Sequence, residues 1–220
     1  MFLTIVKKVA CMPMVAYKTI VCGRLIYADA AVMLGLLLFA IFYALIVVDY
    51  SQPPAEDAAM LMRYALHLAE GHGVVWNIGE KPVDGATDFL FMVMVAILIK
   101  VGLTPETAVR ILCFVTHVLN VILIYFSLRF LFNMNWKFDL LPSFYLAVAT
   151  GPLYIASCFG APVFAFFASL TWLFALWLIF KGFSWFSVLG FGMFSLITGL
   201  IRPEGVILTL LMLFFNYLCS

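Results

Sequence analysis

Residues 30–48 of the chain, AAVMLGLLLFAIFYALIVV, form a stretch without a charged side chain. About 20 apolar residues in an α-helix cross the hydrocarbon core of a bilayer, which is about 30 Å thick. The stretch is continuously apolar rather than alternating, and a helix satisfies its own backbone hydrogen bonds inside lipid. We therefore predict a membrane-spanning helix at 30–48, preceded by a cytoplasmic leader at 1–29.

The composition of the whole chain extends this prediction. Of the 220 residues, 66% are hydrophobic and 10% are charged, whereas a soluble domain has about 25% charged residues. The net charge is +1 and there is no basic block, so we expect no nucleic-acid partner. The five cysteines show no metal-binding spacing and are expected to pack as small apolar residues. The sequence predicts an all-α polytopic membrane protein with one transmembrane domain over 1–220, in contact with membrane lipids.

Further apolar runs set the number of spans. Four of them are long enough to cross and a shorter one follows; they lie at 111–128, 140–159, 163–180, 183–201 and 205–219. The run at 140–159 is marginal, because it contains Pro142, Gly151 and Pro152. The run at 89–99 is different, because a helix of this length reaches only roughly 16 Å, about half of a bilayer. We predict about six spans, and a re-entrant or interfacial helix at 89–99.

The distribution of charge favours this layout, because lysine and arginine concentrate in short cytoplasmic loops. If 89–99 does not cross and the N-terminus is inside, one set of basic residues shares the cytoplasmic side: Lys7, Lys8, Lys18, Arg24, Arg129, Lys137 and Lys181. Most acidic residues then lie outside. If 89–99 crossed, Arg129 and Lys137 would move to the outer side, against the rule.

The polar segment at 49–110 is therefore predicted to be an outer loop. Glu56 and Asp57 begin a helix after two prolines, and Gly71 ends it. Polar and apolar residues recur on separate faces of this helix, as in an amphipathic helix on a membrane surface. Thr104 and Pro105 begin a further helix, as its cap and first-turn residue.

Two groups of side chains in this layout are candidates for a catalytic or substrate-binding role. Glu56 and Asp57 could supply the base that a transfer to a hydroxyl group needs, or they could be ordinary acids that favour a helix N-terminus. Arg202 could bind a phosphate, or it could extend to the membrane surface beside the helix break at Pro203. The residues alone leave both alternatives open.

An ordered series of motifs resembles the first outer loop of GT-C fold glycosyltransferases, most closely the mycobacterial-type arabinofuranosyltransferases and their bacterial relatives. That family carries an Asp-Asp pair, then Arg-Tyr-Ala, Gly-His-Gly, Asn-x-Gly-Glu and Glu-Gly-x-Thr-Asn-x-Leu. Here the corresponding residues are Glu56-Asp57, Arg63-Tyr64-Ala65, Gly71-His72-Gly73, Asn77-Ile78-Gly79-Glu80 and Asp84-Gly85-Ala86-Thr87-Asp88-Phe89-Leu90. Far downstream, Arg202-Pro203-Glu204-Gly205 resembles the family's Arg-Pro-Glu-Gly segment.

The resemblance implies a fold and a reaction. GT-C enzymes are helical membrane proteins that pass a sugar from a polyprenyl-phosphate donor, with inversion, to a glycan or protein acceptor on the extracytoplasmic face. It implies Asp57 or Glu56 as the catalytic base, with Arg202 at the donor phosphate. The other motif residues implied at the substrate are Arg63, Tyr64, His72, Asn77, Glu80, Asp84, Thr87, Asp88 and Glu204. We assign no cofactor, but a divalent cation such as Mg²⁺ or Mn²⁺ at Glu56 and Asp57 stays open.

The chain also departs from the family pattern. Glu56 and Asp88 stand where the family has aspartate and asparagine, and Gly160-Ala161-Pro162 stands where a glutamate is usual. Relatives are usually longer, so we expect the N-terminal part of a longer enzyme or a shortened paralogue. The alternatives to an enzyme of a bacterial inner membrane are an inactive GT-C subunit acting as a scaffold and a transporter of a lipid-linked sugar.

Overall fold

The computed structural model describes residues 23–82, 87–131 and 136–219, and no strand occurs among them. The predicted all-α fold is confirmed for this part of the chain. Its helices are α2 (Gly23–Val47), α3 (Glu56–Ala69), α4 (Phe89–Lys100), α5 (Pro105–Leu131), α6 (Trp136–Val148), α7 (Gly151–Ala156), α8 (Ala161–Lys181), α9 (Trp185–Ile201) and α10 (Glu204–Cys219).

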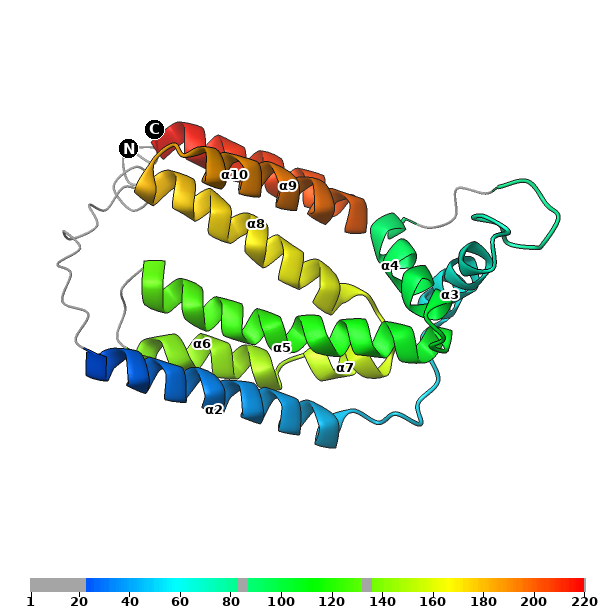
Figure 1. The fold of residues 1–220 in the computed structure, drawn as a ribbon, viewed down its shortest axis with the longest axis horizontal. Coiled ribbons are helices and arrows are strands. Elements are labelled where there is room, and N and C mark those ends of the chain that lie inside the picture. Colours follow the sequence, from blue (N-terminus) through cyan, green and yellow to red (C-terminus); the bar gives the residue numbers. More distant parts are fainter. Residues whose placement is uncertain (1–22, 83–86, 132–135, 220) are drawn as a thin grey trace, which may run out of the picture.

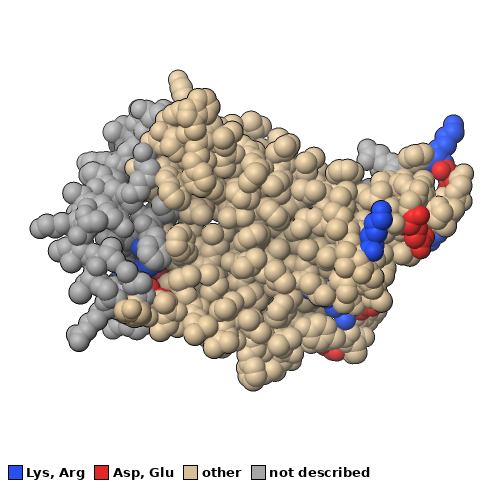
Figure 2. Space-filling view, viewed as in Figure 1, with Lys and Arg blue, Asp and Glu red and all other residues tan. Residues whose placement is uncertain are grey.

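The long helices run side by side in one elongated bundle (Figure 1). α5 lies in the middle, with α2, α6 and α7 on one side and α8 on the other, and α9 and α10 pack beyond α8. α3 and α4 pack against each other at one end of the bundle, where α5 begins and α9 ends. On the flank shown in Figure 2, charged side chains are concentrated at the two ends and the surface between them carries almost none.

Within the described ranges, three helices are long and apolar enough to cross a membrane: Tyr27–Val47, Pro105–Arg129 and Ala161–Phe180. They match three of the predicted spans. α9 and α10 are shorter apolar helices of 17 and 16 residues. At 1.5 Å per residue each reaches roughly 25 Å, which is slightly less than the thickness of a typical hydrocarbon core.

The prediction of one helix over 140–159 is wrong. The chain forms α6 and then α7, which follows α6 in line beside α5 (Figure 1). Pro152 lies in the first turn of α7, where its missing N–H costs no helical hydrogen bond. Gly151 lies against His117 of α5, and a Cβ on Gly151 would come within 2.2 Å of the imidazole ring. The break therefore lets α7 pack closely against α5.

Two shorter helices, α3 and α4, form in the segment 49–110 where the sequence predicts them. α3 buries Ala58, Met62 and Ala65 and exposes its acidic first turn, and Gly71 follows it with a φ of 88°, a value that favours glycine. α4 has 12 residues, about 18 Å at 1.5 Å each, so the half-length helix predicted at 89–99 is confirmed. α4 packs against α3, α5 and α9 instead of running along the bundle (Figure 1).

At the end of the bundle opposite α3, hydrogen bonds and an ion pair connect α2 and α5. The Arg129 Nε donates a hydrogen bond to Asp29 Oδ1 at 2.9 Å, and the Tyr125 hydroxyl donates to the same oxygen at 3.3 Å. Asp29 is buried, and a buried carboxylate needs such a partner. Arg129, whose cytoplasmic location stays a prediction, thus joins the first long helix to the central one.

The turn between α9 and α10 depends on a close backbone contact at Gly205. A Cβ on this residue would lie 2.5 Å from the carbonyl oxygen of Thr198 and 2.8 Å from the backbone nitrogen of Gly199. Backbone atoms cannot rotate away as a side chain can. The packing of α10 against α9 therefore explains why glycine ends the Arg-Pro-Glu-Gly segment.

We expect Gly205→Ala to destabilise the protein by about 1–3 kcal/mol, because the added methyl group pushes α10 away from α9. The measurement is the thermal unfolding midpoint of the purified protein in detergent. Gly192→Ala in α9 is the matched control, since nothing lies within 4 Å of a Cβ at that position. Equal midpoints for the two variants would contradict the packing argument.

Candidate functional site

A pocket of about 190 Å³ lies at the end of the bundle that carries α3 and α4. Four separate parts of the chain form it: the first turns of α3, residues 87–91, the loop between α7 and α8, and the residue that follows α9. Its lining consists of Asp57, Ala58, Met60, Leu61, Thr87, Asp88, Phe91, Cys158, Phe159, Gly160 and Arg202. Four of the predicted site residues, Asp57, Thr87, Asp88 and Arg202, are therefore brought together.

Arg202 is the cation of the pocket. Its Nε lies 3.3 Å from Asp88 Oδ2, and both side chains are largely buried, with exposed fractions of 23% for Arg202 and 17% for Asp88. The guanidinium also lies over the rings of Phe159 and Phe164, at 5.4 Å and 5.9 Å from their centroids. A guanidinium on apolar ring faces is partly desolvated, which strengthens its attraction for an anion.

Asp88 precedes α4 and faces Arg202. Burial raises the pKa of the Asp88 carboxyl, and this effect outweighs the lowering by the Arg202 charge and by its hydrogen bond. The Thr87 hydroxyl also donates to Asp88 Oδ1, at 3.4 Å. The carboxylate is thus held in the pocket by one strong partner, at an energetic cost of desolvation.

Asp57 and Glu56 differ in where they lie. Both are exposed in the first turn of α3, but only Asp57 lines the pocket. Neighbouring residues of a helix point in directions about 100° apart, so α3 directs one of the two acids into the pocket. Within the described residues, the Asp57 carboxylate makes no hydrogen bond or ion pair.

The loop between α7 and α8 shapes the opposite wall. Cys158 has a φ of 60°, in the left-handed region that is uncommon for residues other than glycine. Burial raises the pKa of the Cys158 thiol, so this cysteine is a poor nucleophile. Gly160 lies against Phe91, and a Cβ at Gly160 would come within 2.8 Å of that buried ring. Both residues therefore set the shape of the wall.

Three of the predicted substrate-binding residues hold a loop instead of lining the pocket. The Arg63 side chain donates hydrogen bonds to the Trp76 carbonyl oxygen at 2.9 Å and to Asn77 Oδ1 at 3.0 Å, and it lies 4.4 Å above the Trp76 ring. The Asn77 Nδ2 donates to Glu80 Oε1 at 3.0 Å. These contacts fix the segment after α3 onto the exposed face of that helix.

We expect Arg63→Gln to loosen this segment. The variant loses the cation–π contact with Trp76 and the paired hydrogen bonds to the Trp76 carbonyl oxygen and Asn77 Oδ1. Together these contacts are worth about 1–2 kcal/mol at an exposed site. Hydrogen–deuterium exchange of the amides at 74–80 should then become about tenfold faster or more, while exchange in α5 stays unchanged. Arg63→Lys keeps the positive charge but lacks the planar guanidinium, so its exchange rate at 74–80 should lie between those of the wild type and Arg63→Gln. An unchanged exchange rate at 74–80 would show that Arg63 does not hold the loop.

The remaining predicted residues lie away from the pocket lining. Tyr64 is buried, with its ring 5.6 Å from that of Trp76. His72 is exposed and lies 3.8 Å from Glu70, and Glu204 is exposed in the first turn of α10. Asp84 falls outside the described residues. Their predicted roles at a substrate stay predictions.

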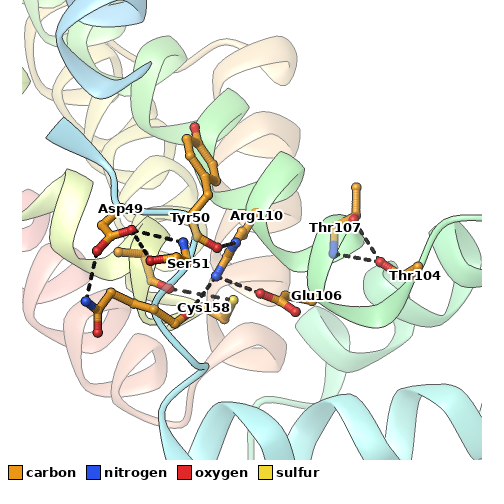
Figure 3. Close-up of polar contacts among 10 residues, drawn as sticks. Asp49, Tyr50, Ser51, Thr104, Glu106, Thr107, Arg110 and Cys158 are labelled. Atoms are coloured by element: carbon orange, nitrogen blue, oxygen red, sulfur yellow. Dashed lines mark hydrogen bonds and ion pairs between the residues drawn. The ribbon is translucent and has the colours of Figure 1, made fainter. Parts of the chain in front are cut away.

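A second group of polar contacts, centred on Arg110, lies near the pocket residue Cys158 (Figure 3). Arg110 of α5 donates to the carbonyl oxygens of Tyr50 at 2.6 Å and Gln52 at 2.8 Å, and it pairs with Glu106 at 2.7 Å. The Arg110 guanidinium is therefore engaged by one carboxylate and two backbone carbonyl oxygens. It thereby fixes the start of the outer segment to the first turns of α5.

Two further sets of local hydrogen bonds lie near this cluster. Hydrogen bonds from Ser51 and Gln52 lower the pKa of the Asp49 carboxyl. The predicted cap at Thr104 is confirmed, because the Thr107 backbone N–H donates to Thr104 Oγ1 at 3.3 Å (Figure 3). The segment between α2 and α3 therefore enters the site in a defined conformation.

The aromatic wall of the site could not be found from the sequence. Phe159 and Phe164 lie at Arg202, and Phe91 lies against Gly160, but the chain has 23 phenylalanines and nothing distinguishes these three. The one available signal is that Gly160-Ala161-Pro162 stands where the family usually has glutamate. A glycine in that place indicates a close contact rather than a charged group.

Comparison with known proteins finds no matching family model, no matching curated protein and no matching solved structure. Over the described part of the chain, no group of three or more His, Cys, Asp or Glu side chains is arranged to hold a metal ion. The divalent cation at Glu56 and Asp57 stays a prediction.

Proposed function

We propose that this protein is a membrane glycosyltransferase that moves a sugar from a polyprenyl-phosphate donor to an acceptor on the extracytoplasmic face. The observation that carries the proposal is that Asp57 and Arg202, far apart in the sequence, line one pocket at the end of an apolar helical bundle. A base and a phosphate-binding cation in one cavity are the two groups that this reaction needs. The ordered motifs of the outer segment support the same reaction.

The proposed chemistry assigns a step to each group. The Asp57 carboxylate accepts the proton of the acceptor hydroxyl as its oxygen attacks the anomeric carbon of the donor sugar. The bond from that carbon to the phosphate oxygen breaks, and the polyprenyl phosphate leaves with the electron pair. Arg202 stabilises the charge that develops on the phosphate. Attack opposite the leaving group inverts the configuration of the anomeric carbon.

The size of the pocket limits the substrate. A volume of about 190 Å³ is smaller than the roughly 300–1,000 Å³ of pockets that enclose drug-sized ligands. It suits one sugar ring with its phosphate better than an extended glycan. The polyprenyl chain would then lie along the apolar flank of the bundle, which Figure 2 shows to be nearly free of charged side chains between its ends. The acceptor, a glycan or a protein, would approach α3 from the aqueous side.

The proposal includes a topology. α2, α5, α8, α9, α10 and the pair α6–α7 would cross the membrane as six spans in a GT-C-like arrangement, with α3 and α4 on the extracytoplasmic face. The N-terminal leader and Arg129 would then lie on the cytoplasmic side of a bacterial inner membrane. The positive-inside rule supports this orientation, and the place of α4 at the same end as α3 agrees with it.

The experiment that tests the proposal uses the purified chain in proteoliposomes with radiolabelled polyprenyl-phosphate sugars. The expected result is labelled acceptor and free polyprenyl phosphate in equal amounts. Movement of the labelled lipid between leaflets without sugar transfer would overturn the proposal in favour of a transporter. Transfer only by an enzyme that co-purifies with the chain would overturn it in favour of a scaffold.

A further inference from the structure

Asp88 forms an ion pair with Arg202, the cation that the proposed function assigns to the donor phosphate. The Arg202 Nε is in contact with Asp88 Oδ2 at 3.3 Å, and no other carboxylate is paired with Arg202 in the described part of the chain. Since Asp88 lines the same pocket, a phosphate that reaches Arg202 lies beside this carboxylate and competes with it for the guanidinium. The pocket as it stands therefore already holds an anion at the proposed phosphate site.

The charges that face Asp88 disfavour a further anion in the pocket. Asp57 of α3 lines the pocket with Asp88, and Glu204 of α10 is close enough to act electrostatically on the Asp88 carboxyl. Arg202 is the one cation among the described lining residues, and the Cys158 thiol of the α7–α8 loop is neutral. With Asp57 and Asp88 ionised, the lining carries a net charge of −1, which repels a phosphate.

We propose that Asp88 takes up a proton when a phosphodiester headgroup binds Arg202, so that this pocket binds its lipid donor more tightly as the pH falls. This inference rests on the proposed function. With Asp88 neutral, Arg202 is released and the net charge of the lining becomes zero. The carboxylic acid can then donate a hydrogen bond to the phosphate instead of competing with it.

The direction of the pH dependence follows from linkage. Burial already raises the pKa of Asp88 above its ordinary value of 3.8 in the free protein, although Arg202 lowers it. In the complex Asp88 loses Arg202 and gains an anion as neighbour, and both changes raise its pKa further. Between the pKa of the free protein and that of the complex, binding takes up one proton. Affinity in that window falls up to about tenfold for each unit of pH increase.

The asparagine variant isolates this effect. Asp88→Asn preserves the shape of the side chain and removes its charge and its proton. The amide cannot hold Arg202 as an ion pair, so the cation is available to the phosphate at every pH. We expect the variant to bind the donor more tightly than the wild type at about pH 8, by about tenfold or more, with little dependence on pH.

The test measures binding of a short-chain polyprenyl phosphodiester of a monosaccharide to the full chain in detergent, between about pH 5 and about pH 8. A phosphodiester is chosen because a phosphomonoester has its own ionisation near pH 6, which would obscure that of Asp88. Wild type, Asp88→Asn and the double variant Asp88→Asn/Arg202→Gln are compared. The double variant removes the cation without leaving an unpaired buried carboxylate, and we expect it to lose at least about tenfold in affinity against Asp88→Asn.

Each result decides one part of the proposal. A pH dependence present in the wild type and absent in Asp88→Asn supports it. If binding requires Arg202 but the wild type and Asp88→Asn have the same pH profile, the role of Asp88 is overturned while the phosphate site stands. If the double variant binds as well as Asp88→Asn, Arg202 is not the phosphate site, and both the proposed donor site and this inference are overturned.

Discussion

Replacing Asp57 with asparagine is expected to lower the rate of sugar transfer by about 10²- to 10⁴-fold, the usual contribution of a positioned general base. The amide has nearly the same shape as the carboxylate but cannot accept the proton of the acceptor hydroxyl. Asp57 is exposed and lacks a partner among the described residues, so the substitution removes no structural contact. The measurement is the initial rate of transfer in proteoliposomes at saturating donor, with the thermal unfolding midpoint as a check on folding.

Glu56→Gln is the matched control for this prediction. Glu56 is adjacent to Asp57, is exposed in the same helical turn and lies outside the lining of the pocket. Its variant should keep at least about half of the wild-type rate, whereas both acids would matter if they held a catalytic metal ion together. Equal rates for the wild type and both variants would remove Asp57 from the chemistry.

The second large effect is expected for Arg202→Gln, on stability as well as on activity. Removing one partner of a buried ion pair leaves the other charge uncompensated, at a cost of about 3–5 kcal/mol. Arg202 and Asp88 each retain some exposure, so we expect about 3 kcal/mol, the lower end of that range. The measurement is the midpoint of thermal or denaturant unfolding of the purified protein in detergent.

A double-mutant cycle separates the pair from its surroundings. Asp88→Asn should cost only about 1 kcal/mol, because Arg202 keeps the rings of Phe159 and Phe164 and reaches the water of the pocket. Asp88→Asn/Arg202→Gln should be more stable than Arg202→Gln alone, because the uncompensated carboxylate is gone. Additive costs of the two substitutions would contradict the ion pair as a stabilising contact.

Much of the helical layout could be predicted from the sequence, because long apolar runs and their flanking charges are strong local signals. The runs at 30–48, 111–128 and 163–180 correspond to the three helices that are long and apolar enough to cross. The amphipathic helix of the outer segment and the half-length helix after it were also predictable, from helical periodicity and from length. Such signals depend on neighbouring residues alone.

The features that failed or were missed depend on contacts between distant segments. The break between α6 and α7 was missed because a 20-residue apolar run outweighed Gly151 and Pro152, and the contact of Gly151 with His117 has no sequence signal. The motifs placed Asp57 and Arg202 in one site, but they also grouped Arg63, Asn77 and Glu80 with it. Those three residues hold a loop, and a motif alone does not separate support from contact with a ligand.

The position of Arg202 after α9 has a consequence for biosynthesis. The other polar residues of the pocket precede α5, so a nascent chain that has emerged only to α8 exposes Asp57 and Asp88 without their cation. The pocket is complete only when α9 has packed against α8 and α4 and has brought Arg202 into place. A ribosome-bound intermediate would therefore carry the acidic half of the site without Arg202 until α9 has emerged.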